Sequence, residues 1–378
     1  LIALVQIGRV HALISIVVTP KDCSKCHTTE FEEMDGSHHS KAGDILASLD
    51  NLLGEVVGGP AAVNAGCRQC HGGLLEFETE GKNKGRPLPG SWPNTGIGRM
   101  NPDGSKGACT ACHGRHRFSR EQARTPDTCG KCHVGPDHPQ IEVFNESKHG
   151  ILYQAFRDKM NIDRVEWVVG VDYKDTSTCA TCHISATPNQ IATHDVGNRI
   201  SWTLRPVVSK KLANWEVRRE RMKDVCRQCH GDPMIEGFYL QFDDLVELYN
   251  TKFAIPAQNM RNELMDMGKI TKADFDEDID WIFWELWHHE GRRARHGASM
   301  SGPDYAWWHG MYEVAKHFYS HFLPEVERIL GPGKAKPFLE KHVLSDPRHR
   351  WYKEGMSKEE LERLNKFYDQ RYGGEEVE

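Results

Sequence analysis

This sequence lacks long apolar runs, a marked excess of one charge, and any cysteine outside one repeated motif. Apolar residues make up only 38% of the 378 residues, and the mean hydropathy is −0.61. The stretch 1–20 is apolar, but Gln6, Arg9 and His11 interrupt it, and no other stretch approaches the length of a membrane span, so no transmembrane helix is predicted. The formal charge of −6 is mild for this length and indicates no nucleic-acid partner.

The stretch 1–20 also lacks the features of a complete signal peptide. It begins with Leu1, has no basic amino-terminal region and has no small-residue cleavage site. We therefore expect 1–21 to be the ragged start of a truncated chain.

All twelve cysteines lie in six copies of Cys-x-x-Cys-His, and none is left over. This motif attaches c-type haem: the two thiols bond to the porphyrin and the histidine ligates its iron. Zinc sites and thioredoxin-like sites also use Cys-x-x-Cys, but six complete copies disfavour zinc or a disulfide framework. The predicted haem-binding cysteines are Cys23, Cys26, Cys67, Cys70, Cys109, Cys112, Cys129, Cys132, Cys179, Cys182, Cys226 and Cys229. The predicted proximal iron ligands are His27, His71, His113, His133, His183 and His230.

Six haems in 378 residues amount to one haem per 63 residues. Haem would then supply much of the apolar core, which explains the low content of apolar side chains. Covalent haem attachment takes place outside the cytoplasm, so we expect the periplasm or an equivalent compartment such as the anammoxosome.

Two regimes follow one another along the chain. From 22 to 234 the motifs recur at irregular spacing among Gly- and Pro-rich loops, whereas 235–378 has no cysteine. In the second region apolar residues such as Phe238, Phe242 and Leu245 recur at helical spacing, and Gly331 ends a long helical pattern. We predict a mainly α fold: a haem-packed multihaem cytochrome c domain over 22–234, then a domain of long helices. Continuous strand alternation is absent.

Two short basic runs lie near acidic residues. One contains Arg292, Arg293 and Arg295, and the other spans 218–223. We interpret both as solvated helix faces or partners of haem propionates.

The chain has 21 histidines, of which fifteen remain after the six proximal ones. A haem that only transfers electrons usually has a second histidine on its distal side, whereas a haem that binds substrate keeps that side open. Five histidines near the motifs are candidate distal ligands, and five would close five of the six haems, although each could equally be exposed or bind a propionate. They are His39 (or its neighbour His38), His116, His149, His194 and His296. No obvious distal candidate lies between His71 and Cys109, so His71 is predicted to ligate the five-coordinate iron.

Several stretches outside the haem motifs carry a further signal. They are Trp92-Pro-Asn-Thr-Gly-Ile-Gly-Arg99, Asn101-Pro-Asp-Gly104, Gly114-Arg-His116, Val134-Gly-Pro-Asp137-His138-Pro139, Ser147-Lys-His149-Gly150, Arg295-His-Gly-Ala298 and Pro303-Asp-Tyr-Ala-Trp-Trp-His-Gly310. With the order and spacing of the motifs, they resemble the octahaem hydroxylamine oxidoreductase family from Cys23 to about Leu330. By this resemblance the six motifs correspond to the third to eighth haems, and eight haems are expected in the full-length protein.

The resemblance implies roles for particular residues. In that family the fourth haem is catalytic, five-coordinate and cross-linked to a tyrosine of a neighbouring subunit. The matching motif ends at His71 and the matching tyrosine is Tyr305, which implies a homotrimer. Asp137 and His138 match the distal acid/base pair, which would accept protons released when N–H bonds are oxidised. Alternatively, Tyr305 is an ordinary interfacial residue, and the stretch around Asp137 is only a turn or His138 ligates another haem.

The resemblance favours oxidation of hydroxylamine or hydrazine, with electrons leaving through bis-histidine haems to a soluble cytochrome acceptor. Two alternatives remain open. A reductive family member would convert nitrite or hydroxylamine to ammonia, and such members lack the cross-linking tyrosine. A cytochrome that only transfers electrons would have a distal ligand on every haem.

Overall fold

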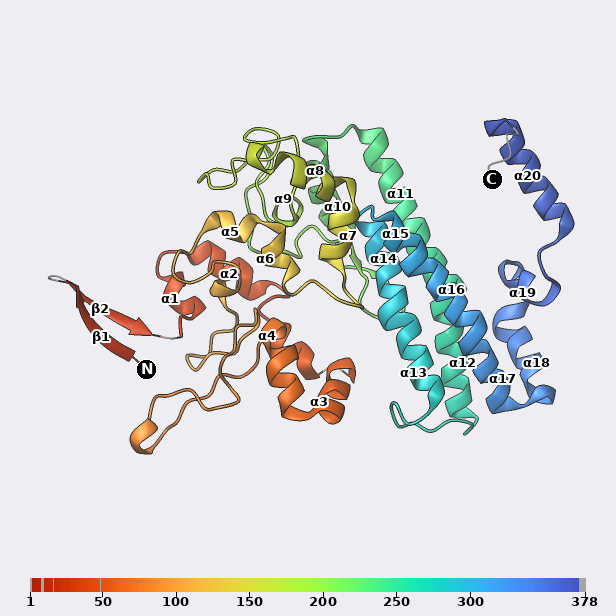
Figure 1. The fold of residues 1–378 in the computed structure, drawn as a ribbon, viewed down its shortest axis with the longest axis horizontal. Helices are drawn as coiled ribbons and strands as arrows, with labels where there is room; N and C mark the ends of the chain where they lie inside the picture. The colour runs from red at the N-terminus through yellow and green to blue at the C-terminus, as the bar shows by residue number, and fades with distance from the viewer. Residues whose placement is uncertain (1, 8–9, 16, 48, 374–378) are drawn as a thin grey trace. The chain divides into compact units, whose positions relative to one another are not determined.

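The computed structural model describes residues 2–7, 10–15, 17–47 and 49–373. The described chain is mainly helical, which confirms the predicted fold class (Figure 1). It forms two compact units. The first unit comprises Leu1–Gly135, Pro139–Thr203 and Lys211–Phe238. The second unit comprises Pro136–His138, Leu204–Lys210 and Tyr239–Glu378.

The division differs in detail from the boundary that the sequence suggests at 234/235. The chain passes into the second unit at Phe238–Tyr239. Two short segments from the haem-motif region also belong to the second unit, and the sequence analysis did not anticipate them. They are Pro136–His138, which contains Asp137, and Leu204–Lys210.

The first unit contains all six haem motifs on short helices and turns. Three of its helices begin at a serine or threonine whose side chain caps the first turn, because its oxygen accepts a backbone N–H. These caps are Ser119, Ser147 and Thr178. The helices and helical turns of this unit are α1 (Pro20–Ser24), α2 (Thr28–Gly36), η1 (Ala42–Ala47), α3 (Leu49–Ala62), η2 (Val63–Cys67), α4 (Arg68–His71), η3 (Gly81–Asn83), η4 (Cys109–Ala111), α5 (Arg120–Arg124), α6 (Pro126–Gly130), α7 (Gln140–Glu146), α8 (Lys148–Phe156), η5 (Arg157–Lys159), α9 (Cys179–His183) and α10 (Trp215–Arg227).

In the described part of the chain, paired strands form in two places, whereas the sequence showed no continuous strand alternation. β1 (Ile2–Ile7) and β2 (Val10–Ser15) pair as an antiparallel hairpin, which the sequence analysis did not anticipate. Their sequence is rich in isoleucine and valine, which favour strands. β3 (Trp202–Thr203) and β4 (Lys210–Lys211) form a second two-stranded sheet.

The second unit consists of longer helical runs, several of which contain π-helical turns. The helix α11 (Asp232–Leu248) leads into this unit. The others are η6 (Tyr249–Ala254), α12 (Ile255–Asp266), α13 (Asp278–Trp284), η7 (Glu285–Glu290), α14 (Gly291–Ser299), α15 (Pro303–Ala306), η8 (Trp307–Tyr312), α16 (Glu313–His317), η9 (Phe318–Phe322), α17 (Leu323–Leu330), α18 (Pro332–Leu339), η10 (Glu340–Leu344), η11 (Pro347–His349), α19 (Trp351–Glu354) and α20 (Lys358–Tyr372). The predicted stop is confirmed, because α17 ends at Leu330 and Gly331 has a φ of +75°.

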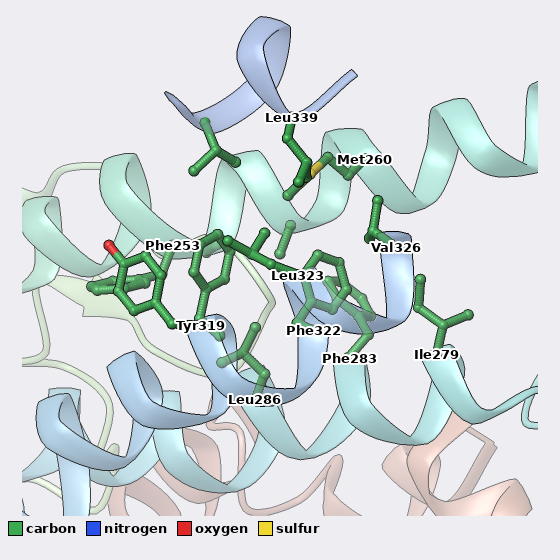
Figure 2. Close-up of a cluster of buried hydrophobic side chains, with 14 of the residues drawn as sticks. Phe253, Met260, Ile279, Phe283, Leu286, Tyr319, Phe322, Leu323, Val326 and Leu339 are labelled. Carbon is green, nitrogen blue, oxygen red and sulfur yellow. The ribbon is translucent and has the colours of Figure 1, made fainter. Parts of the chain in front are cut away.

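A conventional apolar core holds the second unit together (Figure 2). Phe318 and Phe322 stack with ring centroids 5.8 Å apart, and the edge of Phe253 meets Phe318 at 5.4 Å. Figure 2 shows Phe283, Leu323 and Val326 entering the same cluster from neighbouring helices. Across the described part of the chain, no helix combines the length and the apolar character that a membrane crossing requires.

Candidate haem sites and the Asp137–His138 pair

The motif Cys179–His183 shows how a haem-binding histidine is oriented. The ring nitrogen Nδ1 of His183 lies 3.1 Å from the carbonyl oxygen of Val196. A carbonyl can only accept, so Nδ1 carries the proton and Nε2 keeps its lone pair for a metal. The buried Arg199 braces the same motif by donating to the carbonyls of Cys182 (2.9 Å) and Ser185 (2.6 Å).

Thiols from different motifs lie next to one another in the first unit. In three pairs the thiols lie close enough for one to perturb the pKa of the other: Cys23 with Cys109, Cys70 with Cys132, and Cys129 with Cys179. None of the cysteines is in a disulfide. Among the described residues, the donors close enough to share one metal ion are all carboxylates, those of Asp276, Glu277 and Asp280. Neighbouring thiols from different motifs are compatible with haem attachment points that lie close together.

Two candidate distal histidines face predicted proximal ones. The rings of His149 and His230 have centroids 6.0 Å apart, and those of His39 and His133 are 6.1 Å apart. An imidazole nitrogen bonds a transition metal at about 2 Å, so two rings on opposite sides of one iron have centroids about 6 Å apart. Both pairs therefore fit bis-histidine ligation. His39 takes this position and its exposed neighbour His38 does not.

The other three candidate distal ligands have different surroundings. His194 lies close enough to His113 for their charges to interact, and its backbone N–H donates to Glu33. His116 is exposed in the loop after its motif. His296 is half-buried in α14 of the second unit.

The motif ending at His71 is braced by backbone packing. The segment 93–99 crosses it, with Ile97 N–H donating to Cys70 O (3.0 Å) and Gly98 N–H donating to His71 O (3.1 Å). A Cβ atom on Gly96 would lie 2.0 Å from the backbone nitrogen of Gly72, so only glycine permits this approach. The stretch Trp92–Arg99 therefore shapes the surroundings of His71.

Asp137 and His138 form a close pair in the second unit. Nδ1 of His138 lies 2.5 Å from Oδ1 of Asp137, and Arg292 donates to Oδ2 from 3.0 Å. Nε2 of His288 is 2.9 Å from the same Arg292 nitrogen and 3.9 Å from Oδ2. The carboxylate of Asp137 is thus held between two imidazoles and a guanidinium.

These neighbours determine the charge of Asp137. Burial alone would raise its pKa, but the hydrogen bond and charge of His138, with the charges of His288 and Arg292, outweigh burial and hold the pKa well below its usual range. Asp137 is therefore ionised near neutral pH.

Sequence reasoning missed Arg292 and His288 as part of this site. The interpretation of the arginine run as a solvated helix face was wrong for two of its members, because Arg292 is 5% exposed and Arg295 is fully buried. The alternative, that these arginines bind haem propionates, stays a prediction. Arg292 also donates to the carbonyl of Arg205, and Arg295 donates to Ser209 from 2.6 Å, so both hold the segment Leu204–Lys210. The available signal was the i, i+4 spacing of His288 and Arg292, which places them on one helix face.

Tyr305 lies half-buried in α15, with its ring 5.6 Å from that of His309. Its backbone position is tightly defined, because a Cβ on Gly310 would lie 2.1 Å from the carbonyl oxygen of Tyr305. Two tryptophans follow it on η8 with more than half of their surface exposed: Trp307 (54%) and Trp308 (57%). Large exposed aromatic side chains of this kind are typical of protein interfaces.

The fold and the haem motifs define a multihaem c-type cytochrome. Residues 99–275 match the family described as "Seven times multi-haem cytochrome CxxCH", and residues 17–134 match "Cytochrome c3". Both matches indicate haem c binding and redox function.

Relatives extend these matches. The chain is 30% identical over 255 residues to a "Probable nitrite reductase-hydroxylamine oxidoreductase fusion protein" of Kuenenia stuttgartiensis, covering 55% of this chain and 27% of that protein. It thus spans about a quarter of the length of this curated relative. A solved structure described as "Hypothetical multiheme protein" has a TM-score of 0.72 at 25% identity, over 84% of this chain and 81% of the other. A "reducing HAO-like protein complex" of Kuenenia stuttgartiensis shares the fold, with a TM-score of 0.61 at 18% identity over 82% and 71% of the two chains.

Proposed function

We propose that this chain is the catalytic part of an oxidoreductase that oxidises hydroxylamine or hydrazine. The observation that carries the proposal is the ionised carboxylate of Asp137, held against His138 by Arg292. Oxidation of an N–H bond releases a proton with each electron, so the site needs an imidazole that can accept the proton and a carboxylate that stabilises the resulting imidazolium. Haem bound to the motifs would supply the redox chemistry, with the iron on His71 open to substrate.

The geometry supports separate tasks for His138 and Asp137. A carboxylate can only accept, so the 2.5 Å contact puts a proton on Nδ1 of His138 and leaves Nε2 as the atom that receives a proton from substrate. Asp137 stabilises the imidazolium that results. Because its pKa is held low, Asp137 orients and stabilises rather than serving as the primary base.

The remaining histidines are proposed as ligands of electron-transfer haems. His149 with His230 and His39 with His133 would each close one haem, as their ring separations suggest. His194, His116 and His296 are proposed as the other distal ligands. The contacts between thiols of different motifs support electron transfer from haem to haem, toward a soluble cytochrome acceptor.

Assembly and compartment complete the proposal. We propose a homotrimer in which Tyr305 is cross-linked to the catalytic haem of a neighbouring subunit, located in the periplasm or an equivalent compartment. The exposed Trp307 and Trp308 beside Tyr305 support an interface on this surface.

A reductive enzyme is the second candidate. The name of the Kuenenia relative couples nitrite reductase with hydroxylamine oxidoreductase, and the pair Asp137–His138 could also deliver protons to substrate. The presence of Tyr305 favours oxidation, because reductive members of the resembled family lack the cross-linking tyrosine.

The test compares oxidation and reduction by the full-length, haem-loaded protein. Hydroxylamine and hydrazine oxidation is followed with cytochrome c as acceptor, and nitrite and hydroxylamine reduction with a reduced viologen. We expect oxidation to dominate, and Asp137→Asn to lower it about 100-fold with haem content unchanged. Tyr305→Phe should abolish the covalent trimer in denaturing gels and shift activity toward reduction. Dominant reduction by the unaltered protein would contradict the proposal.

A further inference from the structure

A second pair of ionisable side chains is buried in the second unit, outside the site described above. Glu290 ends η7 and His317 ends α16, and their side chains are only 13% and 11% exposed. Nδ1 of His317 lies 2.9 Å from Oε1 of Glu290. A buried carboxyl and imidazole in contact can share a single proton.

Three polar atoms of this cluster are buried without a hydrogen-bond partner among the described residues. They are Oε2 of Glu290, Nε2 of His317 and Nε of Arg293. Leaving such atoms unpaired costs about 1–3 kcal/mol each, so buried polar groups normally have partners. The outer atoms of the pair, one on each side, are thus positioned to receive and release protons.

Charged groups face this pair from each neighbouring element. Arg293 lies one turn along from Glu290, and Glu313 on α16 accepts from Arg293 at 2.6 Å. Both of their charges act on Glu290, and Glu290 in turn acts on Tyr249 of η6. Burial raises the pKa of Glu290, although His317 and Arg293 oppose this, so the carboxyl can hold a proton more readily than an exposed glutamate.

A series of charged side chains next to Glu290 is increasingly exposed to solvent. The side chains of Arg293, Glu313 and His309 are 21%, 31% and 52% exposed, and Nδ1 of His309 lies 3.5 Å from Glu313. On the other side, the ring of the exposed His321 lies 4.9 Å from that of His317.

The π-helical turn that carries Glu290 also carries His288, which lies next to Asp137. His288, which neighbours Asp137, has its ring 5.2 Å from that of His289, and Glu290 is the next residue. Burial, together with the charge of His288, lowers the pKa of His289 to about 4. His289 is therefore neutral near neutral pH.

We propose that Glu290 and His317 relay protons between the buried side of η7, the turn that also carries His288, and solvent at His321. The relay rests on the proposed function for its direction, which is outward during oxidation. A proton that reaches Glu290 forms the carboxylic acid. His317 then accepts a proton at Nδ1 and releases the one it carries at Nε2 to water beside His321. The ring returns to its first tautomer before the next transfer, and no electron moves in these steps.

The test uses the full-length, haem-loaded protein with Glu290→Gln, Glu290→Asp and His317→Gln. Glu285→Gln is the matched control, because Glu285 is exposed on the same π-helical turn. We expect Glu290→Gln and His317→Gln to lower turnover about tenfold and to raise the solvent deuterium isotope effect, with KM and haem content unchanged. Glu290→Asp, which keeps a carboxyl, should recover most of the activity, and Glu285→Gln should behave like the unaltered protein.

A second measurement needs no substrate and separates this proposal from the proposed function. Infrared difference spectra between oxidised and electrochemically reduced protein should contain a protonated-carboxyl band that disappears in Glu290→Gln and shifts in Glu290→Asp. Loss of the band supports the relay even if neither hydroxylamine nor hydrazine is oxidised. The relay is overturned if that band persists in Glu290→Gln, or if Glu290→Gln matches Glu285→Gln in both turnover and isotope effect.

Discussion

The two units differ in what fills their interiors. The first unit has short helices, long loops and six haem motifs, and its apolar residues such as Ile151 and Val165 include many that are exposed. The second unit has long helices around aromatic and aliphatic side chains that are almost fully buried, such as Phe318 and Leu323. The comparison teaches that a cofactor can replace a side-chain core in one part of a chain while an ordinary core forms in another.

Removal of haem should produce the largest difference in stability between the two units. If the chain is produced without haem attachment, we expect the backbone amides of 22–238 to lose most of their protection from hydrogen exchange. Those of α12, α13 and α17 should keep theirs, because their core consists of side chains. Exchange mass spectrometry on the haem-loaded and haem-free chains measures this. Equal loss of protection in both regions would show that the second unit also depends on haem.

A cavity in the core of the second unit should have the opposite effect. Phe322 is fully buried, so Phe322→Ala should cost about 3–5 kcal/mol of unfolding free energy, with haem absorption unchanged. Phe367→Ala on the exposed face of α20 is the control and should cost little. Denaturant unfolding followed by near-ultraviolet circular dichroism provides the measurement. A change in the haem spectrum of Phe322→Ala would contradict the separate roles of the two interiors.

Acid should destabilise the second unit through His349. This side chain is 1% exposed, and burial, with the charge of Lys252, lowers its pKa to about 4. Below pH 6.5 the histidine is protonated in the unfolded chain but stays neutral in the folded chain until about pH 4. The free energy of unfolding therefore falls as the pH drops from 6.5 to about 4, by up to about 3 kcal/mol. His349→Gln should flatten this part of the profile. An unchanged profile would assign the acid sensitivity to other groups.

Arg292 should have the smallest effect of the four, on activity rather than on stability. In Arg292→Gln the pKa of Asp137 should rise toward its usual range, so Asp137 becomes protonated at a higher pH and the acid limb of the turnover profile moves upward. Near neutral pH, where Asp137 stays ionised, we expect a loss of about fivefold, or about 1 kcal/mol, because the carboxylate loses the hydrogen bond from Arg292 that positions it. Arg328→Gln, which removes an exposed partner of Glu325, is the control. If the acid limb of the turnover profile moves equally in both variants, the shift comes from the change in net charge and not from the contact between Arg292 and Asp137.

The sequence predicted the parts of the molecule that depend on local pattern. The haem motifs, the mainly helical class and the helix stop at Gly331 all follow from residue types at fixed spacing. Asp137 and His138 were also found from sequence, because they are adjacent and because the surrounding stretch resembles a known family. Within the first unit, the sequence offered His149 as a candidate distal ligand, but its facing of His230 came only from the structure.

Tertiary structure alone decided the partners of these residues. Arg292 reaches Asp137 across 155 positions of the chain, and His317 reaches Glu290 across 27, so no local pattern records either contact. An arginine run in sequence looks solvated, because whether a guanidinium is buried depends on the helix face that packing covers. The sequence by itself determined where haem is attached and where helices form. The packing of helices decided which charges are buried together, and therefore which groups can hold or move a proton, because burial and neighbouring charge set a pKa.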